Sequence, residues 1–239
     1  MGEKGVTGTG GKETNFDERR QAARERMQEI EARIGKDAGG RDAFFNAVYE
    51  QAEGDAAAVP WADLAPKAHL VQWLEANNGF GLSALDIACG LGDNAESLAA
   101  AGYRTTAFDL ADDAIAWARQ RFPGSEVEYT TADLFDPPAE WGGAFDLVNE
   151  CYTLQALPPG MLEQTAAAIA DLVAPNGRLL VYTRTRPNGT FADGPPWPLE
   201  EANLDRFERH GFAKESETRF TIDRSYRVIP HSFAVWRKV

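Results

Sequence analysis

From residue 83 onward, short apolar runs alternate with segments of helical spacing. The first run is Ser83-Ala84-Leu85-Asp86-Ile87-Ala88, and further runs cover 105–109, 127–129, 145–150 and 178–183. Helical segments at 93–101, 112–121 and 160–173 separate most of them. Strands that alternate with helices of this length form a parallel sheet with helices on both faces. This pattern constrains the fold more than any other feature of the sequence.

The end of the chain departs from this alternation. A loop rich in Pro and Gly at 186–198 precedes a predicted helix at 199–210, and two predicted strands follow at 212–221 and 228–237. Two strands without a helix between them favour an antiparallel hairpin. The expected fold class is therefore α/β. We predict a Rossmann-like, doubly wound, seven-stranded sheet that is mostly parallel, with an antiparallel C-terminal hairpin and helices on both faces.

The residues before the alternation predict a tail and a helical extension. Residues 1–14 are rich in Gly, Thr and Lys, which is typical of a flexible tail. A charged helix follows, capped by Asn15 and ended by Gly35, and its apolar residues share one face: Phe16, Ala23, Met27, Ile30 and Ile34. Three interpretations of this helix are open: it packs on the body of the chain, it forms a homodimer contact, or it covers a substrate as a lid. The predicted regions are thus a tail at 1–14, a helical extension or lid at 15–78 and the α/β domain at 79–239.

The distribution of charge argues against nucleic acid as a partner. The net charge is −13, and residues 1–40 are neutral overall, so the rest of the chain carries all of it. An acidic body repels phosphate backbones. No apolar run approaches the ~18 residues of a membrane helix, and the N-terminus lacks an apolar signal core. Cys89 and Cys151 make no disulfide framework, so we expect a cytoplasmic protein that does not bind membranes.

The strand at 83–88 leads into a glycine-rich turn, Asp86-Ile87-Ala88-Cys89-Gly90-Leu91-Gly92-Asp93-Asn94. Gly90 and Gly92 allow a tight turn that approaches a ligand closely, and the following helix supplies free N–H donors. Doubly wound sheets bind nucleosides at this edge. Asp93 places negative charge where a pyrophosphate would lie, and Asp86, at the end of the first strand, suits a cationic amino group. Asp109, at the end of the second strand, suits both hydroxyls of a ribose. We therefore expect a nucleoside with a zwitterionic or cationic tail.

Four motifs in this order resemble those of class I S-adenosylmethionine-dependent methyltransferases, over residues 60–239. Asp86, Gly90 and Gly92 match the first motif, acid-x-x-x-Gly-x-Gly. Asp109 matches the acid that binds ribose, and Asp133 matches the acid after the third strand that receives the adenine amino group. Phe145-Asp146-Leu147-Val148-Asn149-Glu150 matches the fourth-strand motif. The resemblance implies that the domain at 79–239 binds S-adenosylmethionine and releases S-adenosylhomocysteine. The implied cofactor residues are Asp86, Ala88, Gly90, Gly92, Asn94, Asp109, Leu110, Asp133, Leu134 and Glu150.

The acceptor is less well defined than the cofactor. Pro60-Trp61, ahead of a helix, resembles the lead-in of thiopurine and thiol S-methyltransferases, which implies a small-molecule acceptor, first of all a thiol or related soft nucleophile. An O- or N-methyltransferase of a natural-product pathway is the alternative, and a nicotinamide-dependent oxidoreductase on the same fold is a more distant one. The sequence lacks the Asn-Pro-Pro-Tyr or Asp-Pro-Pro-Tyr signature of N-methyltransferases that act on nucleic acid and protein glutamine.

In this family the exit of the fourth strand, residues 150–159, faces the transferring methyl group. The catalytic candidates are Tyr152, which lines the pocket or contacts the cofactor, and Glu150, which binds the cofactor or acts as a base. The expected substrate-binding residues are Trp61, Phe45, Tyr49, Tyr152, Gln155 and Trp197. Core packing is the alternative interpretation for the aromatic ones. None of the three histidines, His69, His210 and His231, lies in a motif, and no cluster has metal-ligand spacing, so we expect no metal.

Overall fold

The structure is a computed structural model, and it describes residues 19, 22–23, 25–27, 29–30, 32–34, 40–224 and 227–239. The chain divides into two units, Met1–Leu64 and Ala65–Val239. The predicted tail at 1–14, the cap at Asn15 and the apolar Phe16 lie outside the described residues. Across the described ranges, no helix combines the length and the apolar character that crossing a membrane would require.

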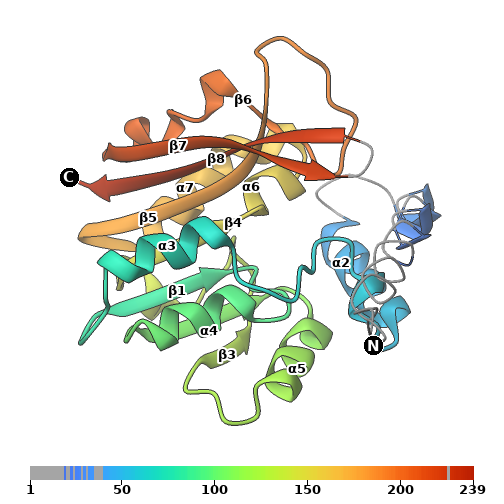
Figure 1. Cartoon of the computed structure of the whole chain (residues 1–239), viewed down its shortest axis with the longest axis horizontal. Helices are drawn as coiled ribbons and strands as arrows, with labels where there is room; N and C mark the ends of the chain where they lie inside the picture. The colour runs from blue at the N-terminus through green and yellow to red at the C-terminus, as the bar shows by residue number, and fades with distance from the viewer. Residues whose placement is uncertain are drawn as a thin grey trace, which may run out of the picture. The chain divides into compact units, whose positions relative to one another are not determined.

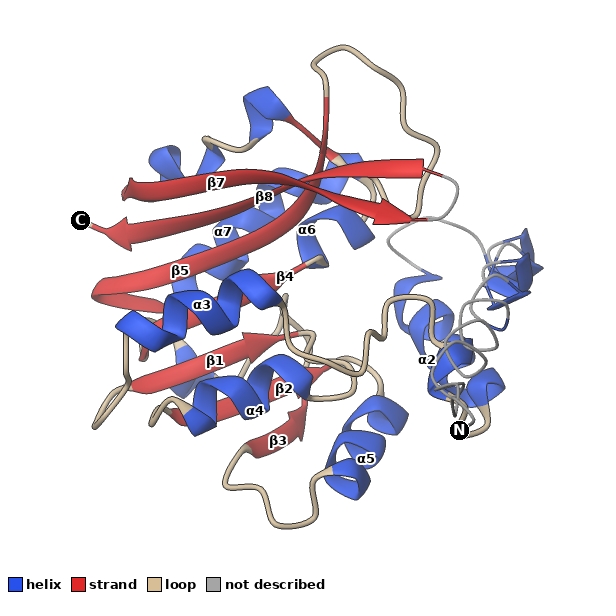
Figure 2. Cartoon of the chain, in the orientation of Figure 1, coloured by secondary structure: helices blue, strands red, loops and turns tan. Residues whose placement is uncertain are grey.

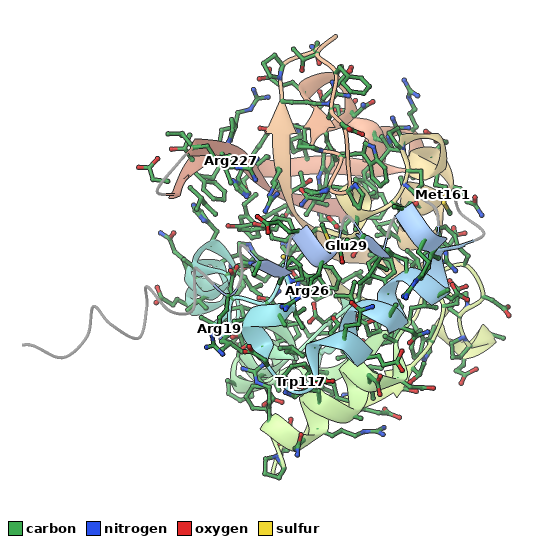
Figure 3. All side chains as sticks on the ribbon, turned by 90° about the vertical axis from the view of Figure 1, so that its right-hand side faces the viewer. Arg19, Arg26, Glu29, Trp117, Met161 and Arg227 are labelled. Atoms are coloured by element: carbon green, nitrogen blue, oxygen red, sulfur yellow. The ribbon has the colours of Figure 1, made fainter. Side chains whose placement is uncertain are left out.

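The first unit is helical over much of what is described. Those of residues 19–34 that the structure describes are helical, and α2 (Arg41–Ala52) and the short 3₁₀ helix η2 (Ala56–Ala58) follow. Ala23 and Ile30 are buried on the predicted apolar face, whereas Arg26 and Glu29 are exposed (Figure 3). Ile30 packs with apolar side chains of α2. The amphipathic helix predicted from residue spacing is confirmed at these positions.

The second unit is built on one mixed sheet (Figures 1 and 2). Its main strands are β1 (Ser83–Ile87), β2 (Arg104–Asp109), β3 (Glu128–Thr131), β4 (Phe145–Cys151), β5 (Val173–Arg186), β7 (Phe212–Arg224) and β8 (Arg227–Lys238). They lie in the order β3-β2-β1-β4-β5-β8-β7, and the two-residue strand β6 (Leu199–Glu200) pairs with β5 off this path. Strands β1 to β5 pair in parallel, whereas β8 pairs antiparallel with β5 and β7. The predicted fold class and C-terminal hairpin are confirmed.

Helices cover both faces of this sheet because successive side chains of a strand point in opposite directions. The helices are α3 (Ala68–Ala76), α4 (Asp93–Ala100), α5 (Asp112–Arg121), α6 (Thr153–Ala156) and α7 (Leu162–Leu172). On one face, Leu70 of α3 and Leu98 of α4 form a cluster with Ala84. On the other face, Ile169 of α7 packs with Leu85. Neighbouring residues of β1 therefore belong to separate layers of the core.

The predicted helix at 199–210 is wrong. In its place the chain forms β6, then the 3₁₀ helices η5 (Glu201–Asn203) and η6 (Arg206–His210). Leu199 pairs with Thr185 of β5, so the start of this segment is a strand. Phe207 is buried in the cluster on the α7 side and anchors η6. Tertiary pairing and burial thus override the local helical pattern here.

The division between the units falls after Leu64, whereas the sequence predicts a boundary after residue 78. The reason is that α3 belongs to the sheet unit, where Leu70 and Leu74 are buried beside the sheet. In addition, the N–H of Lys67 donates to Oδ1 of Asn94 at 3.0 Å, which ties the start of α3 to α4. The helical extension is therefore shorter than predicted.

Candidate functional site

The turn after β1 adopts backbone conformations that favour glycine. Gly90 and Gly92 have φ angles of 55° and 89°, in the left-handed region that side chains disfavour. A Cβ atom on Gly92 would lie 2.4 Å from Oη of Tyr129 in β3. Ala88 also has a positive φ, at 49°. Non-glycine residues in such conformations gather at functional sites, where the surrounding structure holds them. The turn is therefore packed tightly against β3.

Asp109, the last residue of β2, holds this turn in place. Its Oδ2 accepts the N–H of Gly90 at 3.0 Å, and its Oδ1 accepts the N–H of Ala111 at 3.1 Å. Burial raises the pKa of Asp109, whereas the N–H groups of Ala111, Gly90 and Leu110 lower it. Because each carboxylate oxygen has two lone pairs, the side chain keeps capacity for further donors. Asp109 can therefore fix the turn and still accept hydrogen bonds from hydroxyl groups of a ligand.

Two further carboxyl groups are buried on neighbouring strands. Asp86 of β1 and Glu150 of β4 are 1% and 0% exposed. Nδ2 of Asn149 donates to Oδ1 of Asp86 at 2.7 Å, and the N–H of Leu154 donates to Oε1 of Glu150 at 3.0 Å. The second oxygen of each group, Oδ2 of Asp86 and Oε2 of Glu150, has no hydrogen-bond partner among the residues that the structure describes. Two buried acceptor atoms thus remain at this edge of the sheet.

The electrostatics of these two groups indicate a cationic ligand. Burial, with smaller contributions from the nearby carboxylates of Asp109 and Asp93, raises the pKa of Asp86 to about 7. Burial likewise raises the pKa of Glu150 to about 8, with a contribution from Asp86. A buried acceptor without a donor costs stability, and a cationic donor removes that cost while it favours the charged carboxylates. The residues present therefore fit a nucleoside that carries a cationic group.

Asp93 forms an ion pair with Arg121, which the sequence analysis did not predict. Nη1 and Nη2 of Arg121 each lie 2.8 Å from a carboxylate oxygen of Asp93, and Nη1 also donates to the carbonyl of Leu91 at 2.5 Å. Asp93 begins α4 and Arg121 ends α5, so each charge lies at the helix end that favours it. The negative charge that Asp93 was expected to place beside the ligand is compensated. Asp93 instead fastens the glycine turn to α5.

The remaining predicted cofactor residues make contacts of their own. Asn94 binds the backbone of Lys67 through its side-chain oxygen. Oδ1 of Asp133 accepts the N–H of Phe135 at 2.9 Å, and Leu134 is buried in the cluster on the α7 side. Asp133 comes shortly after β3, whose residue Thr131 pairs with Asp109. The roles predicted for Asn94, Leu110, Asp133 and Leu134 at a cofactor stay predictions.

Tyr152 follows β4 and has a contact that no local motif indicates. Its φ is 73°, and its Oη lies 2.9 Å from Nε2 of His231. Nδ1 of His231 lies 2.8 Å from the carbonyl oxygen of Ile229. Nζ of Lys67 and Cζ of Arg184 lie 4.7 Å and 5.6 Å from the centroid of the Tyr152 ring. The structure thus adds His231, Lys67 and Arg184 to the predicted site, from parts of the chain distant in sequence.

Gln155 and Trp197 are linked to each other and to β5. Oε1 of Gln155 accepts the N–H of Arg184 at 2.6 Å and the hydroxyl of Thr183 at 3.2 Å. The carbonyl of Gln155 accepts the N–H of Trp197 at 2.6 Å. The side-chain oxygen of Gln155 is therefore committed to β5, and a contact of either residue with an acceptor stays a prediction.

The three predicted acceptor residues of the first unit form an aromatic cluster within that unit. Nε1 of Trp61 donates to Oη of Tyr49 at 2.9 Å. The centroid of the Trp61 ring lies 5.8 Å from the ring centroids of both Phe45 and Tyr49, in edge-to-face geometry. Core packing accounts for these contacts. That the cluster contacts an acceptor stays a prediction.

The family model of a methyltransferase domain matches residues 84–177, which include the glycine turn, Asp109 and Glu150. A protein of Aromatoleum aromaticum named ubiquinone biosynthesis O-methyltransferase is 36% identical over 119 residues, which cover 48% of this chain and 50% of the relative. A protein of the same name from Xanthomonas axonopodis pv. citri is 35% identical over 116 residues, or 47% of each chain. The chain therefore spans about half the length of the curated relatives it matches.

Solved structures that share the fold of this chain include two methyltransferases. A 1,6-didemethyltoxoflavin-N1-methyltransferase of Burkholderia thailandensis superposes with a TM-score of 0.62 at 20% identity, over 83% of this chain and 87% of that chain. A magnesium protoporphyrin IX methyltransferase of Synechocystis PCC 6803 superposes with a TM-score of 0.59 at 18% identity, over 95% of this chain and 100% of that chain. At such identities the likeness describes the arrangement of the sheet and its helices.

Proposed function

We propose that this chain is a class I S-adenosylmethionine-dependent methyltransferase that transfers a methyl group to a hydroxyl group of a small molecule. A methyltransferase domain matches its residues 84–177. One observation carries the proposal. Within the matched domain, Asp109 holds Gly90 of the glycine turn, while Asp86 and Glu150 each keep a buried oxygen without a partner among the described residues. This set of acceptors suits a ligand with ribose hydroxyls at one end and a cationic group at the other.

The chain's own residues supply binding and orientation. Asp109 would hold the ribose, and Asp86 and Glu150 would receive the cationic amino acid part. When bound, S-adenosylmethionine supplies a methyl group that is activated by its positively charged sulfur. The Burkholderia thailandensis and Synechocystis methyltransferase structures described above contain S-adenosylhomocysteine, which supports the same cofactor here. Catalysis would then depend chiefly on holding the acceptor in line with that methyl group.

A hydroxyl acceptor is favoured over the thiol first expected. The Aromatoleum and Xanthomonas relatives described above are named O-methyltransferases. The expectation of a thiol rested on Pro60-Trp61, and the contacts of Trp61 with Tyr49 and Phe45 need no acceptor to account for them. A hydroxyl must also lose its proton on methylation, and Tyr152 at the exit of β4 is a polar group suited to this task.

Positive charge near Tyr152 adds to this argument. Lys67 and Arg184 lie beside the ring of Tyr152, although the chain as a whole has a net charge of −13. Fixed positive charge stabilises the negative charge that develops on an oxygen as its proton leaves. A thiol gains less from such help because its thiolate already forms near neutral pH.

The test is an assay of the full chain with isotopically labelled S-adenosylmethionine and matched phenols, aliphatic alcohols, thiols and amines. Transfer of label to hydroxyl acceptors is expected. Transfer to thiols or amines alone would contradict the proposed acceptor, and the absence of transfer despite tight S-adenosylhomocysteine binding would indicate a non-catalytic binding protein. Calorimetric titration with NADH completes the set, because tight binding of NADH alone would favour an oxidoreductase.

Two variants distinguish loss of the proposed cofactor site from the general effect of removing an acidic side chain. Asp109→Ala removes the acid that holds the turn, and Asp113→Ala removes an exposed acid from the first turn of α5. Loss of methyl transfer is expected for the first variant and wild-type activity for the second. Equal activity of the two variants would contradict the role given to Asp109.

A further inference from the structure

We propose that Tyr152 and His231 form a relay that removes the proton of the acceptor hydroxyl, Tyr152 as the group that meets the acceptor and His231 as the base behind it. The inference rests on the proposed function, since only an acceptor that carries a proton requires it. Oη of Tyr152 lies 2.9 Å from Nε2 of His231, which is hydrogen-bond distance. No sequence motif surrounds His231, and the structure alone brings these residues together.

The second nitrogen of His231 determines the direction of this hydrogen bond. Nδ1 lies 2.8 Å from the carbonyl oxygen of Ile229. A carbonyl oxygen only accepts, so Nδ1 carries the hydrogen. In the neutral ring Nε2 is then an acceptor, and the hydroxyl of Tyr152 donates to it. His231 is thus held in the tautomer that can take a proton from Tyr152.

The backbone around Tyr152 is shaped to make this contact. Tyr152 has a φ of 73° without being glycine, a strained conformation of the kind that is concentrated at functional sites. Its N–H donates to the carbonyl of Tyr182 in β5 at 3.0 Å. Because β8 runs antiparallel to β5, His231 pairs with Arg184 near the carboxyl end of β5. Figure 1 shows β8 between β5 and β7, which places its first half at this edge of the sheet.

The surroundings of the pair favour a neutral, proton-accepting His231. His231 is 2% exposed, and its ring centroid lies 5.4 Å from that of Phe220 in β7 and 5.8 Å from that of Tyr182 in β5. Among the described residues, the charged groups of Lys67 and Arg184 lie 4.7 Å and 5.6 Å from the centroid of the Tyr152 ring, and the ring of Tyr182 lies beside both Tyr152 and His231. Positive charge on Lys67 and Arg184 opposes a permanently charged imidazole and favours a negatively charged oxygen at Tyr152.

The proton transfer balances without a further reactant. As the acceptor oxygen forms its bond to the methyl group, its O–H bond breaks and the proton passes to Oη of Tyr152. The original proton of Tyr152 passes to Nε2 of His231, which becomes a cation. After the product leaves, the proton returns through Tyr152 to water, and His231 is neutral again.

The test combines the variants His231→Gln and Tyr152→Phe with two phenols of similar shape. One phenol has a pKa well above the assay pH, and the other has a pKa below it and needs no base. With the weakly acidic phenol, each variant should lose at least ~100-fold in kcat, the lower range of general-base effects. With the acidic phenol, kcat should stay close to that of the wild type. The double variant should lose no more than either single variant, because the two residues act as one unit.

A binding and a spectroscopic measurement complete the test. The affinity for S-adenosylhomocysteine should be unchanged in His231→Gln. In spectra of ¹⁵N-histidine-labelled chain, His231 should show hydrogen on Nδ1, and its Nε2 signal should shift in Tyr152→Phe. The chain has three histidines, so the signal that His231→Gln removes identifies it. His210→Gln is the matched control, because His210 lies on η6 near Glu163, and this variant should retain wild-type kinetics.

Three results would overturn the relay: equal loss of kcat with both phenols, no loss with either, or hydrogen on Nε2 of His231. Failure of the proposed function looks different, because the wild-type chain would then methylate no hydroxyl at all, and the relay would be refuted with it.

Discussion

Oδ2 of Asp109 accepts a hydrogen bond from the N–H of Gly90 at 3.0 Å, so the acid at the end of β2 fixes the glycine turn that follows β1. The same carboxylate also accepts the N–H of Ala111. One side chain therefore joins two turns at the edge where the cofactor is proposed to bind. Changes at this position should affect folding and binding together.

The first prediction separates these two roles of Asp109. Asp109→Asn replaces one acceptor oxygen by a donor, so one of the two buried N–H groups loses its partner. The free energy of unfolding should fall by about 1–3 kcal/mol, and the affinity for S-adenosylhomocysteine should fall at least ~10-fold, which corresponds to 1.4 kcal/mol. Urea unfolding and calorimetric titration measure the two effects. Wild-type affinity in a folded variant would argue against ribose binding by Asp109.

The second prediction concerns the contact between Gly92 and Tyr129. In Gly92→Ala a new methyl group would lie 2.4 Å from Oη of Tyr129, at a φ of 89°. The variant should lose about 1–3 kcal/mol of stability from strain, as measured by urea unfolding. Adding Tyr129→Phe should restore part of the loss, because it removes the clashing oxygen. Gly124→Ala is the control, since nothing lies within 4 Å of its added Cβ, and equal losses for both glycines would contradict the argument.

The third prediction concerns the ion pair of Asp93 and Arg121. Their side chains are 17% and 21% exposed and meet through two hydrogen bonds. A double-mutant cycle with Asp93→Asn and Arg121→Met should give a coupling energy of about 1 kcal/mol, at the upper end for surface pairs. The more exposed pair of Arg178 and Glu215 should couple more weakly in a parallel cycle. A coupling near zero for Asp93 and Arg121 would mean that they do not fasten the turn.

The fourth prediction concerns pH and Asp86. Burial raises the pKa of Asp86 from 3.8 to about 7 in the folded chain. Between these two values the folded chain holds a proton that the unfolded chain has lost, so the free energy of unfolding falls as pH rises through this window. Asp86→Asn should reduce this slope by about one proton and make the chain more stable than the wild type at pH 8.

Urea unfolding of both proteins at pH 5, 6, 7 and 8 measures the change. Burial is the main cause of the raised pKa of Glu150, so Glu150 keeps a raised pKa and part of the slope should remain in the variant. The same substitution should weaken S-adenosylhomocysteine binding, because it removes an acceptor for the cation. An unchanged slope would show that Asp86 does not hold a proton in the folded chain.

Much of the fold and of the cofactor site follows from local sequence. The alternation of apolar runs and helical segments predicts the parallel strands, because the spacing of apolar residues in each segment indicates which of its side chains are buried. Asp86 and Asp109 can be found in the same way, since the carboxyl ends of parallel strands meet at one edge of a sheet. The helix predicted at 199–210 is wrong because Leu199 pairs with β5, a contact that its own segment does not encode.

The sequence by itself determined the parallel strands, the glycine turn and the acids that follow the strands, because these are properties of short segments. Only the tertiary structure decided that Arg121 compensates the charge of Asp93 and that Tyr152 meets His231, 79 positions further along the chain. Both contacts depend on how helices and antiparallel strands pack on the sheet. The physical reason is that side-chain partners distant in sequence are set by strand order and register, which no local pattern records.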